Sequence, residues 1–166
     1  KILRHGADAL HHPSTLVTNF TPETESLIDD MVQTMYSANG IGLAAPQIGV
    51  PLRIFIVDLS VGQNVDDLIT FVNPILVKEE GTQLEEEGCL SLPGFNSKIT
   101  RPEKVIVTGL NRKGNSHTIE ATGLMARAFQ HEMDHLDGKL FVDHLKGLQK
   151  SLMLRRIKKL SRTGKW

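Results

Sequence analysis

Residues 131–135 read H-E-x-x-H, so His131 and His135 lie four positions apart with Glu132 between them. On an α-helix this spacing puts both imidazoles on one face, where they can bind a single divalent metal ion. Glu132 then lies close enough to take a proton from a water activated by that ion. The pattern predicts a helix that carries a metal site, and favours a metal-activated hydrolase.

The sequence around this motif is mainly apolar, which predicts that the helix is buried on most sides. Its apolar residues are Leu124, Met125, Ala126, Ala128, Phe129, Met133 and Leu136. Buried histidines and acids need partners, and a metal ion supplies them. An exposed helix with solvated polar residues is the plainer alternative. We expect the helix over about 122–137, with Gly138 following it as the C′ residue.

The rest of the chain shows the pattern of an α+β protein. A first helix is predicted from Pro22, with Thr21 as its N-cap, until Asn39. Further elements are expected at 52–59, 69–77, 104–110 and 117–121 as strands, and at 145–161 as a helix. Because the strands cluster before the metal helix, we predict antiparallel β-sheets packed around a central metal-binding helix, plus an N-terminal and a C-terminal helix.

Length and composition bound the class of protein. The chain has 166 residues, of which 40% are hydrophobic and 23% charged, and we predict a single domain over 1–166. No apolar run approaches the ~20 residues that cross a bilayer, so no membrane association is expected. The one cysteine, Cys89, cannot form an internal disulfide, which fits a reducing compartment or a thiol used for chemistry.

Charge is unevenly distributed along the chain. Residues 1–145 contain 11 Lys+Arg and 19 Asp+Glu, a difference of −8, whereas residues 146–166 contain 8 Lys+Arg and no acid. Such a basic C-terminal helix favours an anionic partner. The commoner explanation is the charged face of an amphipathic helix whose apolar stripe packs on the body of the protein. The residues expected in that stripe are Leu145, Leu148, Leu152 and Leu160.

Two histidines do not complete a tetrahedral site, so a third protein ligand is expected. No glutamate follows Glu132, and Phe141 stands where the extended H-E-x-x-H-x-x-G-x-x-H pattern has its last histidine. Both common peptidase layouts are therefore disfavoured, and His144 is expected to be a surface or capping residue. Cys89 is a chemically reasonable ligand, because a thiolate beside a divalent cation is deprotonated, but spacing alone does not establish it.

Three segments in this order resemble the peptide deformylase family: GIGLAAPQ at 40–47, EGCLS at 87–91 and QHEMDH at 130–135. The similarity covers about residues 1–145. The resemblance implies a metalloenzyme that removes the formyl group from N-formylmethionine on new polypeptides, with Cys89, His131 and His135 as metal ligands. It implies Fe²⁺ as the native ion, although Zn²⁺, Ni²⁺ and Co²⁺ suit the same ligands.

The resemblance also implies roles for other residues. Glu132 is expected to move the proton, while the Gln47 side chain and the Leu90 backbone N–H stabilise the oxyanion. A loop-surface amide is the plainer account of Gln47, and the glycines of the 40–49 loop also permit tight turns. The expected substrate-binding residues are Ile41, Gly42, Leu43, Gly88, Leu124, Arg127 and Ala128.

Weaker expectations concern residues around the site. Glu87 and Arg101 are expected either to form a pair that steadies the cysteine loop or to be simple solvated charges. Asp134 is expected to orient a ligand histidine or to lie at the helix edge. The sequence departs from the family after Gly94, where many members carry an arginine that reaches the substrate and this chain has residues 95–97, FNS.

The resemblance implies N-formylmethionyl nascent peptides as partners, and ribosome docking through the basic C-terminal helix, as in some relatives. The location implied is the bacterial cytoplasm, or an organelle if a targeting peptide has been removed. Two alternatives stay open: an H-E-x-x-H peptidase, and a catalytically silent relative with a structural metal. Glu132 argues against the silent relative, because a closed structural site needs no general base.

Overall fold

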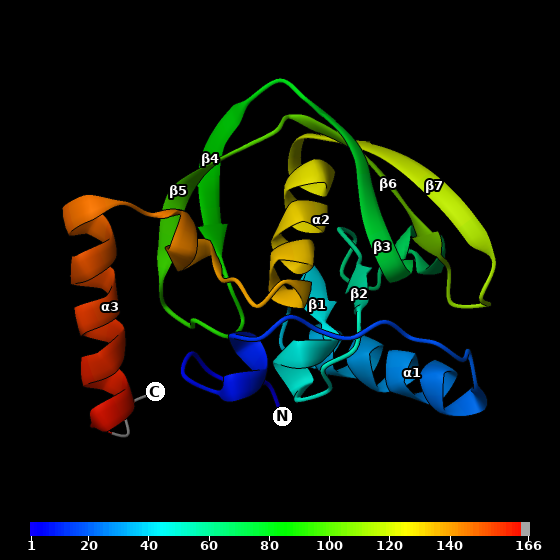
Figure 1. The fold of residues 1–166 in the computed structure, drawn as a ribbon, viewed down its shortest axis with the longest axis horizontal. Coiled ribbons are helices and arrows are strands. Elements are labelled where there is room, and N and C mark those ends of the chain that lie inside the picture. Colours follow the sequence, from blue (N-terminus) through cyan, green and yellow to red (C-terminus); the bar gives the residue numbers. More distant parts are fainter. Residues whose placement is uncertain (164–166) are drawn as a thin grey trace.

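The computed structural model describes residues 1–163, which contain three α-helices and two antiparallel β-sheets (Figure 1). The larger sheet has the order β1 (Gly42–Ala44), β2 (Ile54–Val57), β3 (Ile69–Glu80), β6 (Lys104–Leu110), β7 (Ser116–Thr122). The smaller sheet pairs β4 (Gln83–Gly88) with β5 (Asn96–Arg101). The helices are α1 (Pro22–Ser37), α2 (Gly123–Leu136) and α3 (Gly147–Arg162). The predicted α+β class is confirmed.

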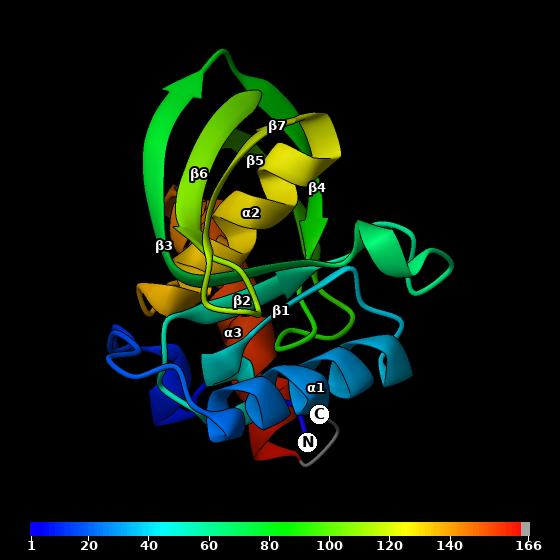
Figure 2. The same ribbon diagram turned by 90° about the vertical axis from the view of Figure 1, so that its right-hand side faces the viewer.

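Helix α2 lies between the two sheets, and Figure 2 shows it enclosed by the curved strands from a second direction. It begins after the N-cap Thr122 and ends before Asp137, as the sequence predicts. Gly138 follows with a φ of 72°, and a Cβ there would lie 2.8 Å from the backbone of His12. Glycine is therefore needed at this C′ position both for its conformation and for the close approach of the chain.

Strand β2 is apolar throughout because both of its faces are covered. Ile54 and Ile56 lie in a core cluster with Met31 of α1, whereas Phe55 packs with Phe129 of α2. The rings of Phe55 and Phe129 are 5.7 Å apart between centroids. Alternating side chains of one strand thus bind the sheet to a helix on each side. This packing fixes β1 and the short 3₁₀ helix after it against the metal-binding helix.

Several predicted boundaries differ from the structure. Helix α1 has the expected N-cap and begins at Pro22. Strand β3, predicted over 69–77, continues to Glu80. The predicted loop at 40–49 contains β1 and a 3₁₀ helix, Ala45–Ile48. Strands β4 and β5 were not predicted. Their residues are mostly polar and exposed, so they lack the run of Ile and Val by which the other strands were recognised.

The predicted apolar stripe of the C-terminal helix is correct in part, because Leu145 and Leu160 pack in one apolar cluster, but it is wrong for Leu148 and Leu152. The helix begins at Gly147, after Leu145, and Leu148 and Leu152 are 73% and 49% exposed. Ile157 is the residue that α3 buries, and it joins a cluster with Leu140, Phe141 and β5. Within residues 1–163 no helix combines the length and the apolar character needed to cross a membrane.

Candidate metal centre and active site

Three potential metal ligands meet where the turn after β4 approaches α2. The ligand atoms of Cys89, His131 and His135 all lie within 4.8 Å of one another. The sulfur of Cys89 is 3.3 Å from Nε2 of His135, and the two imidazole rings are 5.0 Å apart between centroids. The helical spacing brings the two rings together, and β4 brings the thiol from elsewhere in the sequence.

The charges of these groups favour a cation. Burial acts to raise the pKa of the Cys89 thiol, but the positive charge of His135 and the hydrogen bonds of His131 and His135 outweigh it and hold this pKa well below its usual range. Burial also acts to lower the pKa of His131. The hydrogen bonds of His131 to Cys89 and Glu87 outweigh this effect and raise its pKa well above the usual value. A thiolate with two imidazoles is a donor set that suits a divalent transition metal, and these three side chains would hold such an ion in their deprotonated forms.

Glu87 fixes the orientation of His131. Its carboxylate accepts a hydrogen bond from Nδ1 of His131 at 3.0 Å, and others from Arg101 Nη2 at 2.9 Å and Arg127 Nη1 at 2.7 Å. Burial acts to raise the pKa of Glu87, but the hydrogen bonds from His131 and Arg101 hold it far below normal. The expected Glu87–Arg101 pair is present, and its bond to His131 leaves Nε2 of that ring for a metal.

Asp134 does not orient a ligand histidine directly. Its carboxylate lies 2.9 Å from Nη1 of Arg101 and 2.7 Å from Nε2 of His144. Asp134 therefore supports His131 only through Arg101 and Glu87. His144, expected to be a surface or capping residue, forms the outer end of this chain of polar contacts.

Glu132 lines the cleft beside the ligands and is 4% exposed. Its Oε1 approaches the backbone of Gly42 so closely that a Cβ there would overlap it, and would lie 3.0 Å from the carboxyl carbon. Its Oε2 is buried without a hydrogen-bond partner among the described residues. Burial raises the pKa of Glu132 to about 7, against the opposing charges of His131 and His135. A carboxyl group with such a pKa can accept and return a proton near neutral pH.

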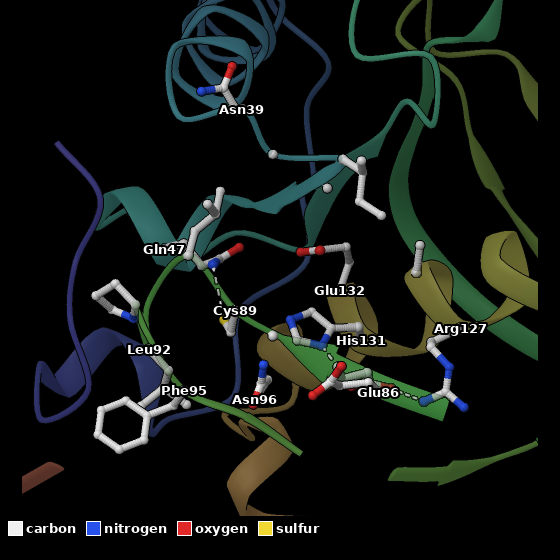
Figure 3. Close-up of a pocket in the computed structure, with 18 of the residues that line it drawn as sticks. Asn39, Gln47, Glu86, Cys89, Leu92, Phe95, Asn96, Arg127, His131 and Glu132 are labelled. Atoms are coloured by element: carbon white, nitrogen blue, oxygen red, sulfur yellow. Dashed lines mark hydrogen bonds and ion pairs between the residues drawn. The ribbon is translucent and has the colours of Figure 1, made fainter. Parts of the chain in front are cut away.

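Gln47 is 1% exposed, so it is not a surface amide. Its Oε1 accepts a hydrogen bond from the Ala44 N–H at 2.8 Å, which turns the amide nitrogen inward. That nitrogen donates to Ser91 Oγ at 3.2 Å and lies 3.7 Å from the Cys89 sulfur (Figure 3). The N–H donor of Gln47 thus points toward the ligand cluster. No pattern in the sequence indicates that Ser91 accepts this hydrogen bond from Gln47.

These groups open into one cavity of about 670 Å³. Most residues expected at the site line it; they are Ile41, Gly42, Gln47, Gly88, Cys89, Leu90, Leu124, Arg127, Ala128, His131 and Glu132. The expectation for Leu43 is corrected, because its side chain is fully buried in the core with Met31 of α1. Successive residues of β1 face opposite sides, so Gly42 meets Glu132 and Leu43 points away.

One wall of the cavity contains the segment where the sequence departs from the family pattern. The segment 92–96, directly after the cysteine turn, lines the cavity, and Asn39 lies across from it (Figure 3). The resemblance implied that the residues after Gly94 lie near the substrate, but the proline and glycine there predict only a turn and did not indicate that the whole segment forms a wall.

Comparison with known proteins agrees with this geometry. The sequence pattern of the family described as Polypeptide deformylase matches residues 1–151. The chain belongs to the peptide deformylase family. It is 47% identical to the peptide deformylase of Acidobacterium capsulatum, over 99% of this chain and 97% of the relative. Enzymes of this family are metal-dependent hydrolases that remove the N-formyl group from nascent polypeptides.

Two solved structures of the family share the fold. That of Legionella pneumophila is 42% identical, with a TM-score of 0.92, and the match covers 99% of this chain and 96% of that one. The Synechococcus elongatus enzyme, crystallised in complex with actinonin, is 36% identical with a TM-score of 0.86, over 99% and 85% of the two chains.

The raised pKa of Glu132 predicts a pH-dependent stability of the metal-free protein. The folded state holds the Glu132 proton up to about pH 7, whereas an unfolded chain releases it near the ordinary pKa of 4.5, so stability falls as pH rises between these values. Replacing Glu132 by Gln removes that cost, which corresponds to about 3 kcal/mol at pH 8 and vanishes below pH 4.5. Urea unfolding of the chelator-treated protein at several pH values measures the difference.

The control is Glu85→Gln, which makes the same charge change at an exposed position of β4. It should follow the wild type at every pH. Parallel stability curves for the wild type and Glu132→Gln from pH 4 to 8 would contradict the assignment of a buried, proton-holding carboxyl.

Proposed function

We propose that this chain hydrolyses the N-formyl group of formylmethionyl nascent peptides and releases formate, with Cys89, His131 and His135 as metal ligands. The observation that carries the proposal is the convergence of three features in one cavity. These are the thiolate–imidazole cluster, the unpartnered oxygen of Glu132 and the inward N–H of Gln47.

The donor set fits Fe²⁺, which we propose as the native ion, and Zn²⁺, Ni²⁺ or Co²⁺ as ions that replace it. When bound, such an ion supplies an activated water and polarises a carbonyl group. The His131 ring is already oriented for the ion by its bond to Glu87.

Different residues of the chain carry out proton transfer and oxyanion stabilisation. Glu132 accepts a proton from the attacking water and returns it to the leaving amine, which its pKa of about 7 allows. The amide N–H of Gln47 and the backbone N–H of Leu90 donate to the formyl oxygen as it becomes negative; one such donor typically lowers the barrier by ~3–4 kcal/mol.

Substrate binding uses the walls of the same cavity. The backbone of Ile41, Gly42 and Gly88 lies where an extended peptide could hydrogen-bond to it. The methionine side chain needs apolar surface, which Ala128 and Leu124 provide at the α2 wall. Arg127 contributes only the aliphatic part of its side chain to this surface, because its guanidinium is hydrogen-bonded to Glu87.

Two other functions are less well supported. A peptidase of the H-E-x-x-H type would need the same base, but its usual downstream ligand is absent from the sequence and the thiol of Cys89 stands in the ligand cluster instead. A structural metal would not require a buried carboxylate oxygen left without a partner beside an open cavity.

The proposal predicts release of formate from a short formyl-Met peptide by protein that has been loaded anaerobically with Fe²⁺ or Ni²⁺. Glu132→Gln should keep its metal but lose about 10²- to 10⁴-fold in kcat, because the proton acceptor is gone while the ligands remain. Cys89→Ala should lose metal as well. Formate production and metal content are measured on the same samples, and an active Glu132→Gln enzyme would show the mechanism to be wrong.

The contact between Gly42 and Glu132 predicts a sharp difference between two glycines of one loop. A Cβ at position 42 overlaps the Glu132 carboxylate, so Gly42→Ala should displace the base and lower kcat about 100-fold. Gly40→Ala is the matched control, because its Cβ would meet the movable end of the Leu90 side chain, 2.7 Å away. We expect a much smaller loss there; equal losses would mean that the loop backbone matters and the position of Glu132 does not.

We further propose that α3 docks the enzyme on the ribosome, in a bacterial cytoplasm, where its substrates emerge. Lys158, Lys159 and Arg162 line a shallow basic hollow on α3, next to the exposed Leu152. Such a surface suits the phosphates of ribosomal RNA. Bacterial relatives support the location.

Ribosome docking predicts a steep dependence on salt. Cosedimentation with ribosomes should fall severalfold between 50 and 200 mM salt, because each neutralised phosphate releases a counterion. A charge-reversed Lys158→Glu/Lys159→Glu protein should sediment less at every salt concentration while hydrolysing short peptides normally. Absence of cosedimentation at 50 mM salt would remove this proposal and leave the enzymatic one intact.

A further inference from the structure

The wall of the cavity formed by 93–96 is anchored on the side away from the catalytic groups. Pro93 and Gly94 are exposed; Gly94 has a φ of 77° and a Cβ there would meet no heavy atom within 4 Å. Phe95, by contrast, is 7% exposed, although it also belongs to the cavity lining. Figure 3 shows its ring on the outer side of the segment, away from Glu132 and His131. The wall is thus a solvent-exposed turn between two buried apolar side chains, Leu92 before it and Phe95 at its far end.

Helix α3 supplies much of what holds Phe95 in place. Phe95 lies in the apolar cluster with Ile157 of α3, and Met153 and Leu154 pack against the same cluster. The guanidinium carbon of Arg156 lies 5.6 Å from the centroid of the Phe95 ring, within the ~6 Å range of a cation–π contact. Figure 1 shows α3 standing beside β5 at one side of the molecule, apart from the larger sheet.

A second contact fixes the next residues along the chain. Gln149, at the start of α3, donates from Nε2 to Ser97 Oγ at 2.8 Å. Ser97 is buried in β5, directly after Asn96, which pairs with Gly88 of β4 beside the cysteine. Arg156 and Gln149, about two helical turns apart on α3, therefore contact Phe95 and Ser97 at the two ends of the segment that runs into β5.

From these contacts we infer that α3 is a substrate-positioning element: Arg156 and Gln149 hold the 93–96 wall at the width at which it binds the formyl peptide. The inference rests on the proposed deformylase function and adds to it. The ligands, Glu132 and Gln47 belong to other elements, so loosening this wall leaves the catalytic groups in place. It weakens substrate binding, which is seen in KM, and spares kcat.

The test compares Arg156→Ala and Gln149→Ala with Arg155→Ala, which removes the same charge from the adjacent exposed position. Metal-loaded enzymes are assayed for formate release from a formyl-Met tripeptide. We expect KM to rise about threefold to tenfold in Arg156→Ala and Gln149→Ala, with kcat and metal content unchanged, and no change in Arg155→Ala. Arg156→Lys should restore part of the KM, because it keeps a cation near the ring.

Hydrogen exchange of the peptide that spans 92–99 gives a second readout that needs no activity. Exchange should be faster in Arg156→Ala and Gln149→Ala than in the wild type or Arg155→Ala. If the wild type releases no formate but these exchange differences appear, the proposed function fails and the anchoring by α3 stands. If the wild type is active and KM does not change, or if kcat falls at constant KM, the positioning role is overturned, whatever the exchange rates show.

Discussion

The buried carboxylate of Glu87 ties the small sheet, whose two strands are paired with each other, to the central helix α2. It comes from β4, and it binds Arg101 of β5 and both Arg127 and His131 of α2. Removing Glu87 would leave the buried guanidinium of Arg127 without its carboxylate partner, a change that typically costs ~3–5 kcal/mol. The small sheet therefore cannot slide along α2 without breaking these contacts. Because Cys89 follows two residues after Glu87, the same contacts set the distance from the thiol to the histidines.

Two carboxylates near the cluster show how surroundings divide their tasks. Glu87 accepts hydrogen bonds from three side chains and stays ionised, so it can only hold groups in place. Glu132 is as deeply buried, but its Oε2 has no partner among the described residues, and its pKa rises to about 7. A buried carboxylate that accepts several hydrogen bonds stays ionised, whereas a buried carboxylate without such donors has a raised pKa and can carry a proton.

The sequence predicted best those parts where periodic pattern and chemistry coincide. Helix α2 follows from its apolar spacing, its two histidines and Gly138, and the fold class follows from the order of helices and strands. Strands β4 and β5 escaped because pairing and the burial of Glu87 and Arg101, rather than apolar content, make them strands. The stripe on α3 was misplaced in part, since counting leucines does not reveal which helix face meets Phe95. Long-range partners such as Gln47 and Ser91 leave no local pattern to read.

A metal at this site would fasten the same two elements that Glu87 already joins. Cys89 lies at the end of β4, and both histidines lie on α2, so one ion bridges the small sheet and the central helix. An ion that binds only when this junction is formed adds its binding free energy to folding. Glu87 orients the His131 ring before an ion binds, so less conformational entropy is lost when the ion binds. In this protein the contacts that stabilise the junction between β4 and α2 are also the contacts that shape the catalytic centre.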